Sequence, residues 1–517
     1  MQAKERSEGN PMLNAYQAPV FTDQDRVLFD RLVPYDHWTR RADARIDFLA
    51  LRKSIENDFS SEGRPAVEPI LCLKLELLMF HDALSDRQVF AKAKTDIAYR
   101  LFLGLGLNDH LPDVSTLRGF RSRLGVEGHK AVFHQLLTQA RSHGLIKDRL
   151  RIKDATHLLA DIAIPAGLQL IAQARNKLLT AAERFAAECV VGERVRVESI
   201  RTSTDSQGDE ARLIARVEHL RDILEWSTKL SAPNDAASDA AWETLQKAIE
   251  IAQKALNGHD DPKASRKLRS TVDPDARRGR HGEYYDGYFT DVLIDADSEL
   301  FTAIDVLPAD GNETADTLNL LDQEQKAHGN VIDQISIDGA GFDGSLIREL
   351  ESRGITSFVP PKEPSNGGRF TTAEFQFSED GSHATCPAGH DSQYRQRDEA
   401  RHTTSFRFAK ETCDACVLMK QCISADQKHG RSVKLNDYEP EYSLLRERKQ
   451  TDEYAAVKKE HPKVERRLGE LVNRLKGRRA RYRGLCRVQV QKLIEGTIHN
   501  VKRMLRLLDR ETGFAIL

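Results

Sequence analysis

The stretch YFTDVLIDADSELFTAIDVLPAD, residues 288–310, decides the fold class, because it contains two runs rich in β-branched and aromatic residues. The polar segment DADSE separates the runs and favours a turn, so the stretch predicts an antiparallel hairpin. A helix pattern from Glu313 to His328 follows, then a β-like run from Val331 to Ile337, a second helix over 344–353 and the short run ITSFVPP. With an upstream β-like run at Leu150, this order predicts a mixed sheet with helices on its faces.

Two acidic residues end β-like runs of this sheet, although aspartate is a poor strand former. Asp154 follows a run that begins at Leu150, and Asp338 follows the run that ends at Ile337. An RNase H-like sheet has this strand order and places the first acid on strand one and the second on strand four. Glu465, in the helix-patterned segment HPKVERRL, is the third candidate. Three such carboxylates can hold two Mg²⁺ or Mn²⁺ ions, the arrangement that drives in-line attack on a phosphodiester.

Charge distribution, rather than net charge, points to a nucleic-acid partner. The chain has 77 Lys and Arg residues against 79 Asp and Glu residues, a net charge of −2. From Lys458 to Arg483, however, basic residues outnumber acidic ones by more than three to one. We expect the basic residues of this segment and of the tail to contact the DNA backbone: Arg474, Lys476, Arg478, Arg479, Arg481, Arg483, Lys502 and Arg503. The alternative is a solvated helix face.

The first 145 or so residues are helix-patterned. Ser85 is a candidate N-cap for one helix, the segment NDHLPDV favours a turn, and a second helix begins near Ser115. This second helix carries Arg118, Arg121 and Arg123 close to its start. Because a helix-turn-helix domain presents amino-terminal side chains of its second helix to the major groove, these arginines are candidates for base contacts. The alternative is an ordinary helical bundle with these arginines on its solvent-exposed face.

The cysteines predict a metal site in a reducing compartment. Seven cysteines are an odd number, which fits a disulfide framework poorly. Four of them lie within 37 residues: Cys386, Cys413, Cys416 and Cys422. The C-x2-C spacing lets two thiolates reach one tetrahedral Zn²⁺, and a closed four-thiolate site is structural. Histidines nearby could substitute for one thiolate, namely His383, His390 and His402. The alternative is a redox pair.

We therefore expect an α/β protein whose RNase H-like catalytic core carries an all-α amino-terminal domain and two insertions. The expected segments are a helical DNA-binding domain (1–145), the first core strand (146–164), a helical insertion (165–270), the rest of the core sheet (271–368), a cysteine-rich zinc-binding insertion (369–434), and a catalytic helix with a basic helical tail (435–517). The start, MQAKERSEGNPMLN, lacks the apolar region of a signal peptide, and no run is long enough for a membrane span. These features predict a cytoplasmic, nucleoid-associated protein.

Over most of its length the chain resembles the DDE transposases of bacterial insertion sequences, most closely insertion-sequence family 1182. The resemblance is carried by DHWTRRADARIDF, GRPAVEPILCLKLELLMF, LSDRQVFAKAKTDIAYRLFLGL and PDVSTLRGFRSRL in the amino-terminal part. It continues through DPDAR, GYFT, CPAG…CDAC…C and the tail ARYRGLCRVQVQKLIEGTIHNVKRML. It implies catalytic roles for Asp154, Asp338 and Glu465, cleavage at terminal inverted repeats, joining to target DNA, and a homodimer on double-stranded DNA.

The chain departs from this family pattern at two motifs. The first acid is usually followed by Gly-Thr, and here the motif is DAT at 154–156. The third acid usually has Arg four residues before it and Lys seven after, where this chain has His461 and Val472. Glu470 is the competing third acid, whereas Glu495 has a spacing that favours core packing. Two other functions stay open: an RNase H-like structure-specific nuclease, and a catalytically inactive DNA-binding regulator.

Overall fold

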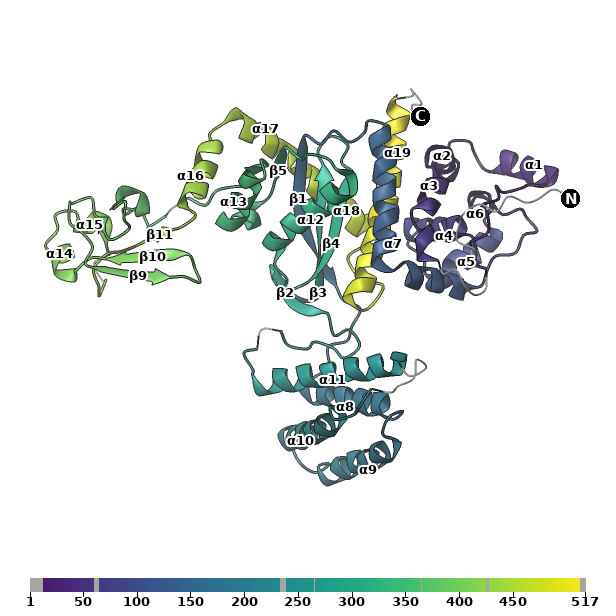
Figure 1. Ribbon diagram of the computed structural model, residues 1–517, viewed down its shortest axis with the longest axis horizontal. Coiled ribbons are helices and arrows are strands. Elements are labelled where there is room, and N and C mark those ends of the chain that lie inside the picture. Colours follow the sequence, from purple (N-terminus) through teal and green to yellow (C-terminus); the bar gives the residue numbers. More distant parts are fainter. Residues whose placement is uncertain are drawn as a thin grey trace.

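The structure, a computed structural model, describes residues 13–59, 65–232, 239–264, 266–363, 365–424 and 427–511. The starting segment MQAKERSEGNPMLN, from which no signal peptide is expected, lies outside these ranges except for its last two residues. In the described ranges, no helix is long and apolar enough to cross a membrane. Figure 1 shows a central sheet with helices, an amino-terminal group of helices on one side, a small stranded lobe on the other, and a separate helical bundle. The predicted mixed α/β architecture with a helical amino-terminal region is confirmed.

The central sheet has six strands. They are β1 (Leu150–Leu159), β2 (Arg277–His281), β3 (Glu283–Asp295), β4 (Phe301–Pro308), β5 (Gln334–Ser336) and β6 (Thr356–Phe358). The long strand β3 pairs antiparallel with β1 on one side and with β4 and β2 on the other. β1 pairs parallel with β5, and β5 pairs parallel with β6. The order is therefore β4-β3-β1-β5-β6, with β2 extending the β4 edge of β3.

The predicted hairpin over 288–310 is confirmed as β3 and β4. The predicted helix from Glu313 to His328 is confirmed as α12, whose N-cap is the Asn312 side chain. Between β5 and β6 the chain forms the 3₁₀ turn η3 (Gly339–Gly341) and the helix α13 (Gly344–Ser352). The sequence pattern did not predict β2, because RRGRH is neither apolar nor alternating. It forms because Gly282, at a φ of +70°, turns the chain into β3.

The amino-terminal helices share one apolar core with the sheet. They are α1 (Asp23–Leu32), α2 (Trp38–Arg45), α3 (Phe48–Lys53), α4 (Pro69–His81), α5 (Asp86–Thr95), α6 (Ile97–Leu103) and α7 (Val114–Ser142). α4 is buried almost throughout, and its apolar residues join a cluster that also contains Ile152, Val292 and Ile304 of the sheet. The predicted N-cap Ser85 is confirmed and forms a capping box with Gln88. α7 lies beside the last helix, α19 (Leu485–Glu511), which continues the same core (Figure 1).

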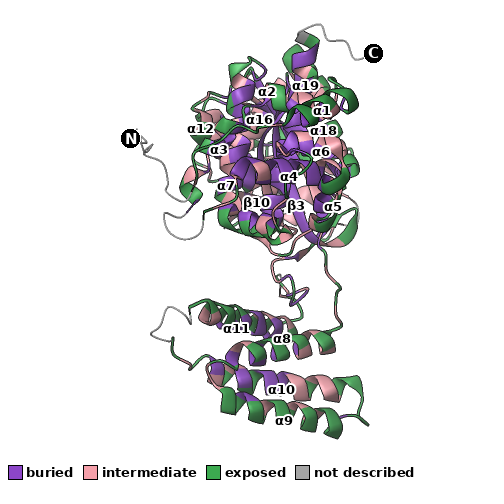
Figure 2. Cartoon of the chain, turned by 90° about the vertical axis from the view of Figure 1, so that its right-hand side faces the viewer, coloured by how far each residue is buried: buried purple, intermediate pink, exposed green. Residues whose placement is uncertain are grey.

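Two further parts have cores of their own. The bundle of α8 (Gly167–Ala182), α9 (Ala187–Ser203), α10 (Asp209–Ser227) and α11 (Asp239–Asp260) buries its apolar residues internally (Figure 2). The lobe contains β7 (Gln376–Phe377), β8 (Ala384–Thr385), β9 (Tyr394–Asp398), β10 (Thr403–Arg407), β11 (Ser432–Asn436), α14 (Lys410–Asp414) and α15 (Met419–Cys422), packed around phenylalanines. From the lobe, α16 (Glu439–Arg448), α17 (Asp452–Glu460) and α18 (Pro462–Arg474) return the chain to the sheet.

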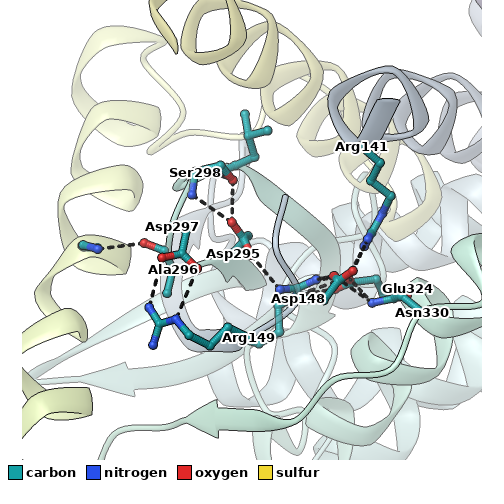
Figure 3. Close-up of polar contacts among 12 residues, drawn as sticks. Arg141, Asp148, Arg149, Asp295, Ala296, Asp297, Ser298, Glu324 and Asn330 are labelled. Atoms are coloured by element: carbon teal, nitrogen blue, oxygen red, sulfur yellow. Dashed lines mark hydrogen bonds and ion pairs between the residues drawn. The ribbon is translucent and has the colours of Figure 1, made fainter. Parts of the chain in front are cut away.

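A buried ionic network fastens the start of β1 (Figure 3). The Arg151 side chain is fully buried and donates to Asp295 at 2.9 Å and to Glu324 at 3.0 Å, with Asp148 as a third partner. Arg141 of α7 donates to the same Glu324 carboxylate at 2.9 Å. These pairs hold the pKa of Glu324 below its usual value despite burial. The network thereby joins β1 to β3, α12 and α7.

Candidate active site

The parallel pairing of β1 with β5 brings Asp154, midway along β1, together with Asp338, just beyond the end of β5. The register pairs Ile152 with Ser336, so each aspartate lies two residues beyond this pair on neighbouring strands. Asp338 lies two residues after the end of β5 and caps η3, where its carboxylate accepts a hydrogen bond from the Ala340 N–H at 2.9 Å. The structure therefore places the two predicted aspartates side by side.

Burial and a neighbouring negative charge set the ionisation of Asp154. Burial, together with the charges of Asp338 and Glu313, raises its pKa to about 7, against the Ala155 N–H and Lys153, which lower it. The Ala155 N–H donates to the Asp154 carboxylate at 2.8 Å. A divalent cation between the two aspartates would favour the ionised form of both. The chemistry of this donor set therefore fits a hard cation such as Mg²⁺.

Lys458 and His461 lie against the end of β5. Lys458 Nζ donates to the Ile337 carbonyl at 2.7 Å, and burial lowers its pKa to about 8 against the opposing effect of Asp338. His461 Nδ1 lies 3.0 Å from Ser336 Oγ, and burial together with the Lys458 charge lowers its pKa to about 4. His461 is therefore neutral at pH 7. Lys458 was not among the predicted site residues, because nothing in its basic local sequence separates it from its neighbours.

Glu465 lies in the first turn of α18 and is exposed. α18 packs against β1, and its Val464 belongs to the core that contains Ile152. Because side chains alternate along a strand, Asp154 shares the face of Ile152. Within the described part of the chain, Glu465 has no ion pair, and no group of three or more His, Cys, Asp or Glu side chains forms a metal-binding cluster. The structure thus brings the aspartates together but leaves Glu465 outside their pair.

Glu470, the competing third acid, and Glu495 already have cationic partners. Glu470 accepts from Arg467 at 3.0 Å and lies 3.2 Å from His499 Nε2, contacts that bring its pKa down to about 2. Glu495 is fully buried and accepts from Lys492 at 2.7 Å. The prediction that Glu495 packs in the core is therefore confirmed, and both carboxylates are neutralised inside the protein.

The basic residues after α18 lie in a loop, residues 475–484, so the alternative of a solvated helix face is wrong. The loop runs beside the end of β1, where the Leu159 N–H donates to the Arg478 carbonyl at 3.0 Å. Arg478 donates to the His157 carbonyl at 2.7 Å, and the Arg481 guanidinium lies 4.5 Å from the Phe80 ring centroid. The exposed basic side chains are Arg474, Lys476, Arg479 and Arg483, while Lys502 and Arg503 of α19 are half-buried.

The three amino-terminal arginines differ in exposure. Arg121 is buried, donates to Asp86 at 2.6 Å and also donates to the Tyr482 hydroxyl, so its donors are engaged within the protein. Arg118 and Arg123 are exposed. The Arg123 guanidinium lies 4.9 Å from the centroid of the Phe59 ring.

The four clustered cysteines line one small cavity of about 20 Å³, together with His390. Their thiols are free and half-buried. Backbone N–H groups point at two of the sulfurs: Leu418 N–H donates to Cys416 Sγ and Arg431 N–H donates to Cys413 Sγ, each at 3.4 Å. The other two histidines face elsewhere, His383 toward Ser382 and His402 toward Asp437.

Two stretches of the chain match known protein families. Residues 27–123 match the family described as Transposase domain (DUF772), a stretch that runs from α1 into the first turns of α7. Residues 385–505 match the family described as Transposase DDE domain, a stretch that contains the cysteines, α18 with Glu465, and most of α19. No curated protein matches the chain.

Proposed function

We propose that this chain, whose two family matches support a DDE transposase of insertion-sequence type, cleaves the ends of an insertion sequence of family 1182 and joins them to target DNA. The observation that carries the proposal is the pair Asp154 and Asp338 on neighbouring parallel strands. The strand order β4-β3-β1-β5-β6, antiparallel over the first three strands and parallel over the last three, supports an RNase H-like catalytic core.

Asp154 and Asp338 would hold the divalent cations, Mg²⁺ or Mn²⁺, that such chemistry requires. When bound, these ions activate the attacking water or 3′-hydroxyl and stabilise the leaving 3′-oxygen. We retain Glu465 as the third ligand for two reasons. Glu470 and Glu495 are already ion-paired, and Glu465 lies on the helix that covers the Asp154 face of β1. The protein would contribute position and charge rather than a general base, since His461, on whose pKa the charge of Asp338 acts, lies 3.0 Å from Ser336 Oγ.

The substrate would be double-stranded DNA, bound by a homodimer. The exposed side chains of Arg474, Lys476, Arg479 and Arg483 support contacts to phosphates close to the end of β1. For base contacts we propose Arg118 and Arg123, which are exposed near the start of α7. Arg121 would instead hold α7 against the loop that carries Tyr482.

We propose one structural Zn²⁺ in the cysteine lobe, although the four cysteines do not form a metal-binding cluster among the described residues. Support comes from the shared cavity of Cys386, Cys413, Cys416 and Cys422 and from the two N–H groups that donate to sulfur, since such second-sphere donors stabilise thiolate ligands. A site with four protein ligands has no open position, so this metal would support the fold of the lobe rather than catalysis.

The test is an assay for cleavage and joining with the purified chain, a duplex that ends in the inverted repeat of the element, and a target duplex. We expect cleavage and joining with Mg²⁺ or Mn²⁺ and neither with a chelator. Cleavage without joining would favour a structure-specific nuclease. Binding of the duplex without cleavage in either metal would favour a DNA-binding regulator.

A further inference from the structure

A cavity of about 370 Å³ lies between the amino-terminal helices and the helices α18 and α19, and neither Asp154 nor Asp338 lines it. α2 and α4 contribute Trp38, Arg41 and His81 to its wall. Six of the lining side chains are arginine or lysine, and one, Glu470, is acidic. The cavity is therefore strongly cationic and is separate from the aspartate pair.

Part of this positive charge has no ion-pair partner among the described residues. Arg41 is paired with Asp509, and Arg503 with Glu299 at 3.2 Å. Lys502 and Arg506 have no ion pair with any described residue. Glu470 accepts from Arg467 at 3.0 Å and forms an ion pair with Arg474 at 3.8 Å, so its single charge is shared among several cations.

The cations of the cavity repel one another. Burial lowers the pKa of Lys502, and the charges of Arg506 and Arg474 lower it further against the attraction of Asp82 and Glu470. Burial also lowers the pKa of Arg503, and Arg467, Arg510 and Arg506 add to this effect against Glu299. Like charges held together in a partly buried space destabilise one another until an anion enters.

An unpaired polar atom also lies in the cavity wall. The His499 side chain is 5% exposed, its Nε2 lies 3.2 Å from Glu470, and its Nδ1 has no hydrogen-bond partner in the described part of the chain. With Nε2–H facing Glu470, Nδ1 is a hydrogen-bond acceptor, so a water O–H rather than a phosphate oxygen would satisfy it. The case for an anion in this cavity therefore rests on its cationic side chains.

We propose that this cavity binds a phosphate group, held by Lys502, Arg506 and Arg474. Phosphate oxygens accept charge-assisted hydrogen bonds from lysine and arginine and would neutralise the repulsion described above. The phosphate would come from the DNA backbone, an assignment that rests on the proposed function, because Arg474 also begins the exposed basic loop. Since Arg474 and Glu465 share α18, a phosphate bound here would also hold the helix of the third acid.

Trp38 provides a direct probe of the cavity. The other two tryptophans, Trp226 and Trp242, pack in the helical bundle, so the chain with both replaced by phenylalanine reports Trp38 fluorescence alone. We would titrate this chain with inorganic pyrophosphate and, separately, with a DNA duplex that ends in the inverted repeat. The test variant is Lys502→Gln/Arg506→Gln. The matched control, Arg194→Gln/Arg201→Gln, removes two exposed charges from α9.

We expect a saturable change in Trp38 fluorescence with both probes, and an affinity at least about tenfold weaker in the test variant but not in the control. A response to pyrophosphate without one to DNA would support the phosphate site but overturn the DNA backbone as its source. No response to either probe, or equal affinities in test and control variants with unchanged thermal unfolding, would overturn the site. The readout needs neither metal nor cleavage, so it is independent of whether the chain proves to be a transposase.

Discussion

At the scale of single residues, the ionisation of Asp154 follows from its position midway along β1. Its pKa of about 7 lies above the ordinary value of 3.8, mainly because of burial and then because of Asp338. Between these two pH values the Asp154 side chain binds more protons in the folded chain than in the unfolded chain. The contribution of Asp154 to the stability of the metal-free protein therefore falls as the pH rises through this window.

The first prediction is that Asp154→Asn removes this loss. Thermal unfolding with a chelator should show the variant gaining stability relative to the original chain between about pH 5 and about pH 8. Mg²⁺ should stabilise the original chain more at the higher pH, because the cation binds the ionised carboxylates. Asp209→Asn, at an exposed aspartate of the bundle, is the control. A difference between Asp154→Asn and the original chain that does not change with pH would argue against the raised pKa.

The second prediction concerns the buried network of Figure 3. Arg151→Met should lower the free energy of unfolding by about 3–5 kcal/mol, because it leaves Asp295 and Glu324 buried with a partner removed. Arg149→Met, two residues earlier in the chain, breaks only the partly exposed pair with Asp297 and should cost about 0–1 kcal/mol. Denaturant unfolding of both variants measures the two costs. Equal costs would mean that the network contributes no more than a surface pair.

At the scale of elements, the sequence pattern predicts those parts whose structure is decided locally. The helix from Glu313 to His328 has an apolar period, an asparagine cap before it and Gly329 in the left-handed conformation after it, so its bounds could be read directly. The loop 475–484 could not, because its conformation depends on pairing with Leu159, which lies more than three hundred residues earlier. β2 was missed because only its pairing with β3 makes RRGRH a strand.

The residues of the candidate site also divide into those that the sequence pattern could predict and those that it could not. Asp154 and Asp338 could be found because an acid at the end of a β-like run is out of place in a strand. The contacts of Lys458 and His461 with β5 could not be found, since they join residues more than one hundred positions apart. Nor could the burial of Arg121, because its partner Tyr482 comes from the far end of the chain. The local sequence pattern identifies candidate catalytic residues, whereas tertiary packing decides which of their side chains are free to act.

The third prediction tests the lobe as a metal-binding element. Metal analysis of the purified chain should find one zinc, and Cys413→Ser/Cys416→Ser should remove it, because two of four thiolate ligands are lost. Cys189→Ser, at an exposed thiol of the bundle, should keep the metal. Chelation should raise hydrogen exchange in residues 370–435 before it does so in the sheet, since metal binding contributes folding energy to the lobe. Unchanged zinc in the double variant would rule out these ligands.

At the scale of the whole molecule, the described residues form one large core shared by several parts, two smaller clusters on the sheet, and separate cores in the bundle and the lobe. The amino-terminal helices, one face of the sheet, α18 and α19 belong to a single apolar core, so the proposed DNA-reading arginines and Asp154 are held in a fixed relation. The bundle and the lobe have separate cores. The cationic cavity lies between the amino-terminal helices and the helices α18 and α19. Because these helices share one apolar core, the cavity can be preformed.

The central claim, that Asp154 and Asp338 form a metal-dependent catalytic centre with Glu465, is tested most directly by the rate of cleavage at the inverted repeat. Asp154→Asn, Asp338→Asn and Glu465→Gln should each lower this rate by more than about 1000-fold while DNA binding is retained, because the three residues act as one unit. Glu470→Gln, which removes an acid of the same helix that is paired with Arg467, should cleave at close to the original rate. Near-normal cleavage by Asp338→Asn, or loss of cleavage in Glu470→Gln but not in Glu465→Gln, would contradict the account.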